Sequence, residues 1–296
     1  MLVSVRQLLQ HAAKHQYAIG AFNTVNLEMT LGIIRAAVEV QAPVIITVTE
    51  TTIEYAGLKP ITHIVETIAK NSAVNVPVAL HLDHAKSFRS IAECIHAGFS
   101  SIMIDASDLP FDENVILTRQ AVDYAHKRNA LAQGEIGNVK TAEEFAAAAD
   151  RQRYLTDPRE AVAFVKATGI DTLAVAVGNV YGRGKMRQGA PPLDLDRLAA
   201  IHESIPDIPL VLHGASALKH EQLEAAIGRG IKIINIVTEL ELAFTDQLRQ
   251  TARELPDEYD PRDLLEPSID AVEALTADKL RLFGSEGRGR AFPKHL

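Results

Sequence analysis

The feature that most constrains the fold is a regular alternation of short apolar runs with longer amphipathic segments along nearly the whole chain. Short runs rich in Val, Ile and Leu are typical of buried strands, whereas apolar residues three or four positions apart are typical of helices that pack on a sheet. Leu27, Leu31, Ile34 and Val38 show the helical spacing. Eight runs are predicted as strands, at 18–22, 44–49, 76–81, 101–105, 131–135, 172–177, 210–213 and 231–236.

Helical segments separate these strands, and a short helix precedes the first of them. The predicted helices lie at 4–14, 27–40, 61–70, 88–97, 114–127, 158–168, 195–203, 221–229 and 239–253. Strands that each lead into a helix predict a parallel sheet covered by helices, and eight such units predict closure into a (β/α)8 TIM barrel. An open doubly wound sheet is the alternative, but no glycine-rich dinucleotide fingerprint follows the first strand. We expect one α/β barrel domain over 1–296, with a C-terminal helical extension at about 256–296.

Charge and cysteine content exclude several classes of protein. The formal net charge is −8 with no basic run, which argues against a nucleic-acid partner or an anionic membrane surface. Cys94 is the only cysteine, so no intrachain disulfide is expected and a reducing, cytoplasmic location fits. The beginning of the sequence lacks the pattern of a secretory signal, and no apolar run reaches the roughly 18 residues of a membrane span. We expect a cytoplasmic protein with no membrane partner.

Polar side chains stand at the predicted C-terminal end of nearly every strand. They are Asn23, Thr49, Asp83, His84, Asp105, Glu135, Asn179, Tyr181, His213, Ser216, Asn235 and Thr238. In a barrel these strand ends converge on one face, which is where barrel enzymes keep their active sites. The pattern therefore favours an enzyme over a structural protein.

Three of these residues form a candidate metal site. His84, Glu135 and His213 end the third, fifth and seventh strands, and two imidazoles with a carboxylate are a known catalytic zinc set that leaves a position open for substrate. The alternative is that the histidines are ordinary, hydrogen-bonded barrel residues. The spacing leaves open whether Asp83 supports a metal ligand, accepts a structural hydrogen bond or acts as a general acid/base. Asp105 similarly fits a supporting group, a second cation ligand or a helix cap.

The last two strands lead into candidate phosphate-binding segments. In the sequences HGAS at 213–216 and NIVTE at 235–239, Gly214, Ser216 and Thr238 lie where barrels often bind phosphate through backbone N–H groups and a helix N-terminus. Capping of the following helices by Ser216 and Thr238 is an equally valid interpretation, and both can hold together.

Two loops depart from the strand–helix rhythm. The loop at 136–156 is long, carries Glu143 and Glu144, and is a candidate mobile lid. The loop at 178–192 is rich in glycine and contains Lys185, so it is suited to binding an anion.

The order of these segments resembles the class II, metal-dependent fructose-bisphosphate/tagatose-bisphosphate aldolase family over essentially the whole chain. The matching pieces are AIGAFNTVNLE, HLDHAKS, HAGFSSIMIDAS with PFDENV, GEIG, LTDPREAVAFVKATGIDTLAVAVGNVYG, PLVLHGAS, INIVTEL and LFGSEGR. The resemblance implies a (β/α)8 barrel that assembles as a homodimer or homotetramer. It also implies a lyase that reversibly cleaves a ketose (bis)phosphate to dihydroxyacetone phosphate and an aldehyde. The implied cofactor is a divalent metal, Zn²⁺ by preference, with room for a monovalent cation.

The resemblance also implies roles for individual residues. His84 and His213 match metal ligands, and Glu135 matches a carboxylate at an alternative, buried metal position. Asp83 matches the acid/base for the aldehyde oxygen, and Glu143 the loop carboxylate that moves the dihydroxyacetone phosphate proton. Three residues are implied to contact substrate: Asn235 at the enediolate, Asn23, and Thr49, which stands in place of a serine. The implied phosphate-binding segments contain Gly182, Lys185, Gly214, Ser216 and Thr238. Arg262 is implied to reach a second phosphate across a subunit interface.

Two departures from the family pattern concern the metal site and the lid. Tyr181 stands where the family has a metal-binding histidine, and a phenol with a pKa near 10 is a poor zinc ligand at neutral pH. Tyr181 is expected to be a weak ligand, a hydrogen-bond donor to substrate or an auxiliary acid. Lys140 and Thr141 replace the paired glycines of the mobile loop, which reduces its expected flexibility. The alternative function is a non-catalytic or regulatory sugar-phosphate-binding homologue without tight metal binding.

Overall fold

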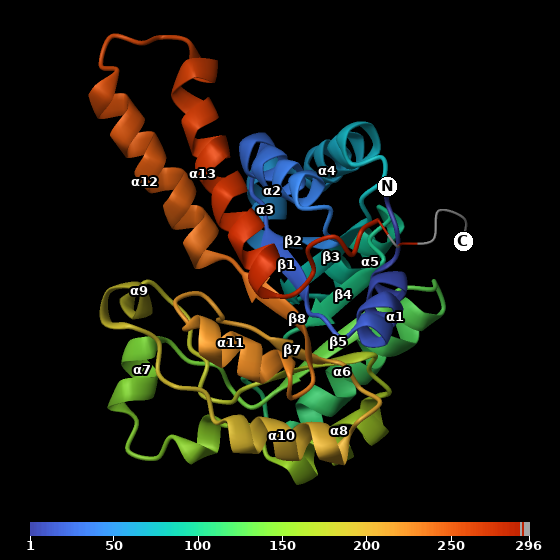
Figure 1. Ribbon diagram of the computed structural model, residues 1–296. Coiled ribbons are helices and arrows are strands. Elements are labelled where there is room, and N and C mark those ends of the chain that lie inside the picture. The colour runs from blue at the N-terminus through green and yellow to red at the C-terminus, as the bar shows by residue number, and fades with distance from the viewer. Residues whose placement is uncertain (291, 293–296) are drawn as a thin grey trace.

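A computed structural model describes residues 1–290 and 292, and within them eight parallel strands close into a barrel in sequence order (Figure 1). This confirms the predicted (β/α)8 architecture. The strands are β1 (Ile19–Asn23), β2 (Val44–Thr49), β3 (Val78–Ala85), β4 (Ser101–Ile104), β5 (Leu131–Ile136), β6 (Thr172–Val175), β7 (Leu210–Leu212) and β8 (Ile231–Ile236).

Helices surround this ring, and most of them lie where the apolar spacing predicts. They are α1 (Val5–His15), α2 (Leu27–Glu39), α3 (Glu50–Ala56), α4 (Leu58–Ser72), α5 (Phe88–His96), α6 (Phe111–His126), α7 (Ala142–Ala147), the 3-10 helix η1 (Gln152–Tyr154), α8 (Pro158–Thr168), α9 (Gly184–Gln188), α10 (Leu195–Ser204), α11 (His220–Ile227), α12 (Thr238–Glu254) and α13 (Pro261–Leu282). The short elements α3, α7, η1 and α9 were not predicted, because segments of three to seven residues are too short to show a helical period. Among the described residues, no helix combines the length and apolar character needed to cross a membrane.

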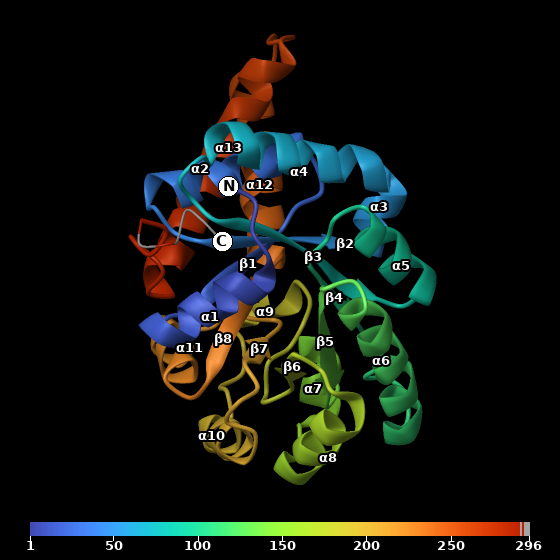
Figure 2. The same cartoon turned by 90° about the vertical axis from the view of Figure 1, so that its right-hand side faces the viewer.

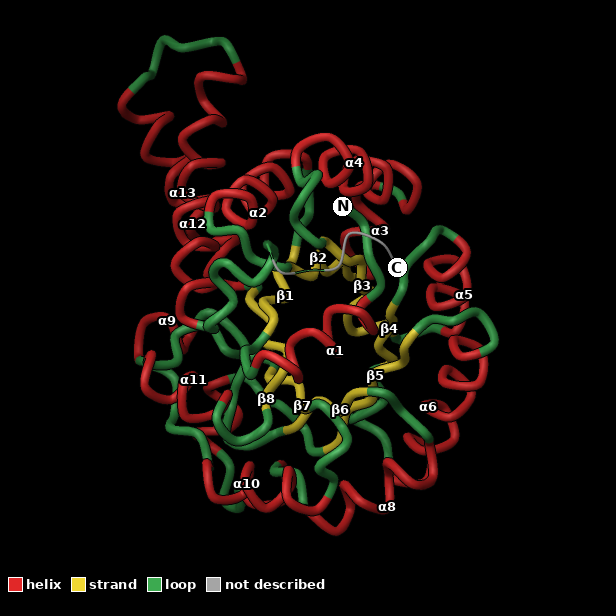
Figure 3. The backbone as a smooth tube through the Cα atoms, turned by 45° about the vertical axis from the view of Figure 1, so that its right-hand side comes forward, coloured by secondary structure: helices red, strands yellow, loops and turns green. Residues whose placement is uncertain are grey.

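Helix α1 closes the N-terminal end of the barrel. Figure 3 shows it lying across the ring of strands. Its buried residues Val5, Leu8 and Ala12 belong to one apolar cluster with inward-facing strand residues such as Ile45 and Val211. Leu8 is fully buried there, so this helix supplies the apolar floor that the open end of the ring would otherwise lack.

A second, larger cluster fills the space between the strands and the outer helices. It takes the opposite faces of the same strands, for example Phe22, Ile46 and Leu80. Strand side chains alternate between the two faces of a sheet, so a continuous apolar strand can serve both clusters.

Helices α12 and α13 form an antiparallel hairpin that projects beyond the barrel (Figures 1 and 2). The middle of α13 packs closely on α2 because α2 carries Gly32 at the crossing, where a Cβ atom would lie 2.8 Å from the carbonyl oxygen of Ile269. The hairpin corresponds to the last predicted helix and to part of the predicted C-terminal extension, of which residues 291 and 293–296 lie outside the described part of the chain. The assignment of 1–296 to a single domain stays a prediction.

Candidate active site

A cleft of about 350 Å³ opens at the C-terminal ends of the strands and collects most of the predicted site residues. Its lining consists of Thr49, Asp83, His84, Asp105, Tyr181, Gly182, Lys185, His213, Gly214, Ser216, Asn235, Val237 and Thr238. Four predicted residues do not line it: Asn23, Glu135, Glu143 and Arg262.

The end of β3 turns two neighbouring side chains toward this cleft. Regular alternation would place Asp83 inside the barrel and His84 outside it. His84 instead has a left-handed backbone with φ of 49°, and the pairing of β3 with β4 shifts register between Leu82 and Ala85. Left-handed backbone is uncommon for a residue other than glycine and marks a functional constraint. This irregularity allows both Asp83 and His84 to line the cleft.

His84 lies at the centre of a group of potential metal ligands. Its Nε2 atom is 3.0 Å from Nδ1 of His213 and 3.2 Å from the hydroxyl oxygen of Tyr181. Its other ring nitrogen, Nδ1, is 2.9 Å from Oδ2 of Asp105. A carboxylate on the far ring nitrogen is the arrangement that orients metal-binding histidines in proteins. Asp105 therefore supports His84 rather than capping the following helix, which begins only at Phe111.

The two imidazoles have opposite electrostatic surroundings. Burial lowers the pKa of His84, but the carboxylates of Asp83, Asp105 and Glu135 outweigh it and raise the pKa to about 9. Burial, together with the neighbouring charge on His84, lowers the pKa of His213 to about 3. In the metal-free protein His84 is therefore protonated, and its Nε2–H donates a hydrogen bond to Nδ1 of the neutral His213.

Asp83 is fully buried beside these imidazoles. Its Oδ2 accepts a hydrogen bond of 3.1 Å from Nδ2 of Asn235, while its Oδ1 has no hydrogen-bond partner among the described residues. Burial on its own would raise the pKa of Asp83, but His84, His213 and His81 together with the Asn235 hydrogen bond lower it below its usual value. The residue is thus an ionised carboxylate with one oxygen available to a cation or to substrate.

The donor set fits a divalent cation. One ligand atom from each of Asp83, His84 and His213 lies within 4.8 Å of the others. A tetrahedral zinc site with bonds of about 2.0–2.1 Å to nitrogen separates its ligand atoms by about 3.3 Å, close to the spacing of the two imidazole nitrogens. Two imidazoles and a carboxylate are also an established zinc set. The site therefore contains two imidazole nitrogens with a carboxylate beside them, which are the kinds of donor that a divalent metal needs.

Glu135 lies near the end of β5 and is not one of this group of three. It is buried, its Oε2 has no hydrogen-bond partner among the described residues, and burial raises its pKa to about 8. The charges of His84 and Asp105 both shift the pKa of Glu135, so its carboxyl group lies close to these two residues. Its role at a second, buried metal position stays a prediction.

Tyr181 does not provide an anionic ligand. Burial raises its pKa well above 10, and the surrounding carboxylates raise it further, so the phenol is neutral. Its backbone pairs with the loop after β5: Tyr181 N donates to the Lys140 carbonyl at 2.8 Å, and Ala142 N donates to the Tyr181 carbonyl at 3.2 Å. The loop predicted to be a mobile lid is therefore tied to the loop that carries Tyr181.

Glu143 lies in the first turn of α7 on this lid and is exposed at the edge of the site. Its carboxylate occupies the space that a side chain at Gly184 would need, so it lies against the start of α9 and does not line the cleft. A capping box formed by Thr141 and Glu144 fixes the beginning of α7. In this position Glu143 does not reach the cleft, and its role in a mobile lid stays a prediction.

The predicted phosphate segments meet on one side of the cleft. Gly214 has φ of 62°, and a Cβ atom there would lie 2.6 Å from the Val180 carbonyl oxygen, so only glycine allows the loops after β6 and β7 to approach this closely. The buried Lys185 ammonium joins them by donating to the carbonyls of Val180 and Gly214 at 2.6 and 2.8 Å. Thr238 begins α12, whose N-terminus has no side-chain cap. A cation and a free helix N-terminus together suit a phosphate.

Sequence reasoning assigned no role to a buried polar layer next to the imidazoles. Gln133 Nε2 is 2.9 Å from Nε2 of His213 and Thr172 donates to Oε1 of Gln133 at 3.4 Å, while His81 Nδ1 is 2.9 Å from Ser101 Oγ. The period of two along a strand could have found them, because His81 and Gln133 stand two residues before Asp83 and Glu135. The contact of Gln133 holds the far ring nitrogen of His213, and Thr172 in turn holds Gln133.

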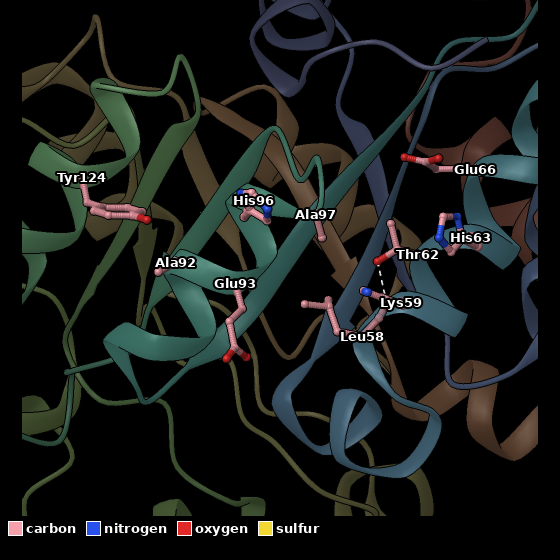
Figure 4. Close-up of a pocket in the computed structure, with 10 residues that line it drawn as sticks. All are labelled: Leu58, Lys59, Thr62, His63, Glu66, Ala92, Glu93, His96, Ala97 and Tyr124. Carbon is pink, nitrogen blue, oxygen red and sulfur yellow. Dashed lines mark hydrogen bonds between the residues drawn. The ribbon is translucent and has the colours of Figure 1, made fainter.

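A wider cleft of about 690 Å³ lies on the outer surface of the barrel, between α4 and α5 (Figure 4). It is lined by apolar groups and polar side chains such as His63, Glu93 and Tyr124, and no predicted site residue takes part. In this protein the volume of a cleft therefore does not indicate where the candidate catalytic residues lie.

Asn23 lines a separate compartment of about 550 Å³ beside the active cleft, which also contains Thr49 and Val237. Arg262 lies in the first turn of α13 at the outer end of the projecting hairpin, where its guanidinium group pairs with Asp260 at 2.6 Å. It is 88% exposed, so within one chain it is not part of the site, and its role toward a partner subunit's substrate stays a prediction.

Comparison with known proteins agrees with this arrangement. Residues 3–288 match the family described as fructose-bisphosphate aldolase class-II. The chain is 41% identical to a fructose-bisphosphate aldolase of Geobacillus stearothermophilus over 97% of its length and 98% of the relative. It is 42% identical to a 6-phospho-5-dehydro-2-deoxy-D-gluconate aldolase of Bacillus subtilis, with 97% of each chain covered.

A solved structure of an aldolase is also similar to this chain. The YdjI aldolase from Escherichia coli K12 superposes with a TM-score of 0.81 at 33% identity, covering 98% of this chain and 100% of the other. These matches span the barrel and the helical hairpin together. None of them supports the alternative of a non-catalytic homologue. The chain belongs to the class II fructose-bisphosphate aldolase family, and it is an aldolase-type lyase.

Proposed function

We propose that this enzyme reversibly cleaves a ketose phosphate to dihydroxyacetone phosphate and an aldehyde, using the C-terminal cleft of the barrel. The observation that carries the proposal is the convergence of His84, His213 and Asp83 next to a phosphate-suited segment. The family establishes aldolase chemistry, and this geometry supplies a site for one phosphorylated ketone.

His84 Nε2, His213 Nδ1 and a carboxylate oxygen are the atoms that would hold a divalent cation, and two imidazoles with a carboxylate suit Zn²⁺. When bound, such a cation polarises the ketone oxygen and stabilises the negative charge that develops on it during cleavage. Asp105 keeps the His84 ring in the orientation this requires, through its contact with Nδ1. The buried Glu135 is the proposed carboxylate of an alternative metal position, and a monovalent cation beside the substrate phosphate is also proposed.

Asp83 is proposed to move the proton of the aldehyde half. As the carbon–carbon bond breaks, its Oδ1 accepts the proton of the hydroxyl group that becomes the aldehyde, and the bond electrons pass into the enediolate of the other half. Asn235 holds Oδ2 of the same carboxylate and is proposed to contact the enediolate through its own amide. The lowered pKa of Asp83 keeps it ionised and ready to accept.

Glu143 is proposed to return a proton to the enediolate carbon, which completes dihydroxyacetone phosphate. Its carboxylate lies at Gly184 in this structure, so the step needs movement of the lid toward the cleft. Tyr181, as a neutral phenol, is proposed to donate a hydrogen bond to substrate. Its hydroxyl is 3.2 Å from His84 Nε2, which puts it beside the proposed metal ligands without making it a strong ligand itself.

The phosphate of the dihydroxyacetone half is proposed to lie against Lys185 and the start of α12. The residues that support this are Gly182, Lys185, Gly214, Ser216 and Thr238. The uncapped N-terminus of α12 offers backbone donors to the phosphate oxygens.

Assembly and location are proposed from the family. A homodimer or homotetramer would allow Arg262 of one chain to approach the site of another, and a cytoplasmic location fits the substrates. Sedimentation of the purified protein tests the assembly.

Metal analysis combined with an aldol-cleavage assay tests the proposed function. We expect purified protein to contain close to one divalent ion per chain, and chelation to abolish cleavage until Zn²⁺ or Co²⁺ is restored. Unaltered cleavage after complete removal of metal would overturn the metal mechanism.

A further inference from the structure

A buried ion pair joins the two helices of the hairpin next to the active cleft. The Nζ atom of Lys279 on α13 lies 2.6 Å from Oε2 of Glu239 in the first turn of α12, and the two side chains are 9% and 12% exposed. Figure 1 shows the two helices side by side along the hairpin. A buried ion pair seldom adds stability over an apolar pair of the same size. Stability of the hairpin alone therefore does not account for these two charges.

The other oxygen of Glu239 binds the loop after β7. Oε1 accepts a hydrogen bond of 2.6 Å from the backbone N–H of Ala217. Ala217 has a left-handed backbone with φ of 64°, which a residue other than glycine adopts when its surroundings hold it there. Ser216 comes directly before Ala217 and Thr238 directly before Glu239, and both of these hydroxyl residues line the cleft. One carboxylate thus ties together the two segments that were assigned to the substrate phosphate.

The same carboxylate places a negative charge beside a site suited to an anion. Burial lowers the pKa of the Lys185 ammonium and the charge of Glu239 acts in the opposite direction, so the two groups are close enough to interact. An unpaired carboxylate here would repel a phosphate dianion and would compete with it for Lys185. The charge of Glu239 therefore has to be offset if this side of the cleft is to bind phosphate.

Lys279 provides the offsetting charge without entering the cleft. It is not one of the residues that line the cleft, and its ammonium is directed at Glu239. Opposite charges this close together largely cancel each other for a third charge further away. The phosphate then meets the Lys185 ammonium and the backbone N–H groups at the start of α12 without net repulsion from Glu239.

We infer that Lys279 is a positioning residue for phosphate binding, because it neutralises the carboxylate that holds the loop after β7 against the start of α12. The inference rests on the proposed function, in which the phosphate of dihydroxyacetone phosphate lies against Lys185. Lys279 acts only through Glu239 and contacts no substrate. The simpler alternative is a link that only holds the two helices together, and the two interpretations predict different effects on phosphate affinity.

Calorimetric titration of the purified enzyme with inorganic phosphate tests the inference. Lys279→Met keeps an unbranched side chain and removes the charge. We expect the Kd for phosphate to rise by about tenfold, in the range that one uncompensated charge near an anion supplies. The KM for dihydroxyacetone phosphate should rise with it, whereas kcat should change by less than about twofold because Lys279 touches no reacting atom. An unchanged Kd would overturn the inference.

A second substitution separates the effect of charge from the effect of packing. Glutamine in place of Glu239 still offers an oxygen to the N–H of Ala217 but carries no charge. The double variant Lys279→Met with Glu239→Gln should therefore bind phosphate within about twofold of the wild type. A double variant that binds as weakly as Lys279→Met would show that Lys279 acts through packing alone, which would overturn the inference.

Glu239→Gln on its own decides the question even if Lys279→Met does not fold. Lys279 then keeps its charge without a counter-charge, so phosphate should bind about threefold more tightly than in the wild type. A Kd equal to or higher than that of the wild type would contradict the inference.

Arg281, two residues further along α13, provides the matched control. Its guanidinium pairs with Glu39 of α2 at 2.9 Å, and its side chain is 42% exposed. Arg281→Met removes the same unit of charge from the same helix and should leave the Kd for phosphate within about twofold of the wild type, because exposed charges are screened. A loss of affinity equal to that of Lys279→Met would trace the effect to net charge and would overturn the inference.

Lys185→Met separates a failure of this inference from a failure of the proposed function. If the wild type binds no phosphate, or if Lys185→Met binds it equally well, the proposed location of the phosphate is wrong and the inference fails with it. If phosphate binding depends on Lys185 but not on Lys279, the inference alone is wrong.

Discussion

The two ends of the barrel interior are built from the same eight strands but have opposite character. At the N-terminal end, Leu8 and Val5 of α1 pack on apolar strand residues in a closed cluster. At the C-terminal end, Asp83, Glu135 and Asn235 each keep a buried oxygen atom without a hydrogen-bond partner among the described residues. Unsatisfied buried oxygens reduce the stability of the fold. The C-terminal end, called the upper end below, is therefore less stable than it could be, but it keeps groups that can bind a cation and a substrate.

This comparison predicts that substitutions at the two ends have separable effects. Changes at the upper end should reduce catalysis with little effect on the free energy of unfolding. Changes at the N-terminal, lower end should reduce the free energy of unfolding with little effect on catalysis.

The largest effect is expected for Asp83→Asn. Loss of the proton acceptor should reduce the cleavage rate by about 10²–10⁴-fold, while exchange of the dihydroxyacetone phosphate proton is largely kept. The free energy of unfolding should fall by no more than about 1 kcal/mol, because asparagine can still accept the hydrogen bond from Asn235. Cleavage, exchange and metal content are measured on the same preparation. Equal loss of cleavage and exchange would contradict the acid/base role, and loss of metal would make Asp83 a ligand.

Leu8→Ala tests the opposite end. Leu8 is fully buried, and removing it leaves a cavity that should reduce the free energy of unfolding by about 3 kcal/mol. The kcat of the folded enzyme should be unchanged, because α1 lies at the end of the barrel away from the cleft. Leu255→Ala, at a side chain that is 45% exposed, is the control and should change stability by less than about 0.5 kcal/mol. Denaturant unfolding and steady-state kinetics check both, and a large loss of kcat in Leu8→Ala would show that the two ends are coupled.

Tyr181→His should strengthen metal binding at the upper end. A third imidazole beside His84 and His213 should raise Zn²⁺ affinity by about tenfold or more, measured by competition with a chelator. Tyr181→Phe removes only the hydroxyl group and should not raise the affinity. If the histidine variant binds metal no better than the wild type, the site differs from a three-histidine site by more than this one residue.

The sequence predicted the barrel and most of the cleft for a physical reason. Strand ends converge in a closed parallel barrel, so Asp83, His84 and His213 could be grouped from their positions alone. Gln133 was missed because a polar residue inside an apolar strand carries no sign of which face it occupies until the register is known. The position of Glu143 and the link between its loop and Tyr181 depend on loop packing, which periodicity does not describe.

The smallest effect is expected from a change of pH, which alters the charge of the Lys185 ammonium at the upper end. Burial lowers the pKa of Lys185 from its usual 10.5 to about 8, although Glu239 opposes the shift. Below pH 8 the ammonium is charged and can attract the phosphate, whereas above pH 8 the free enzyme must take up a proton to bind it. The KM for dihydroxyacetone phosphate should therefore rise by about tenfold between about pH 7 and about pH 9. The phosphate itself does not titrate in this range, since its second pKa is near 6. In Lys185→Met the KM should be high at both pH values, and a wild-type KM that stays constant would show that the phosphate is held by backbone donors rather than by this buried charge.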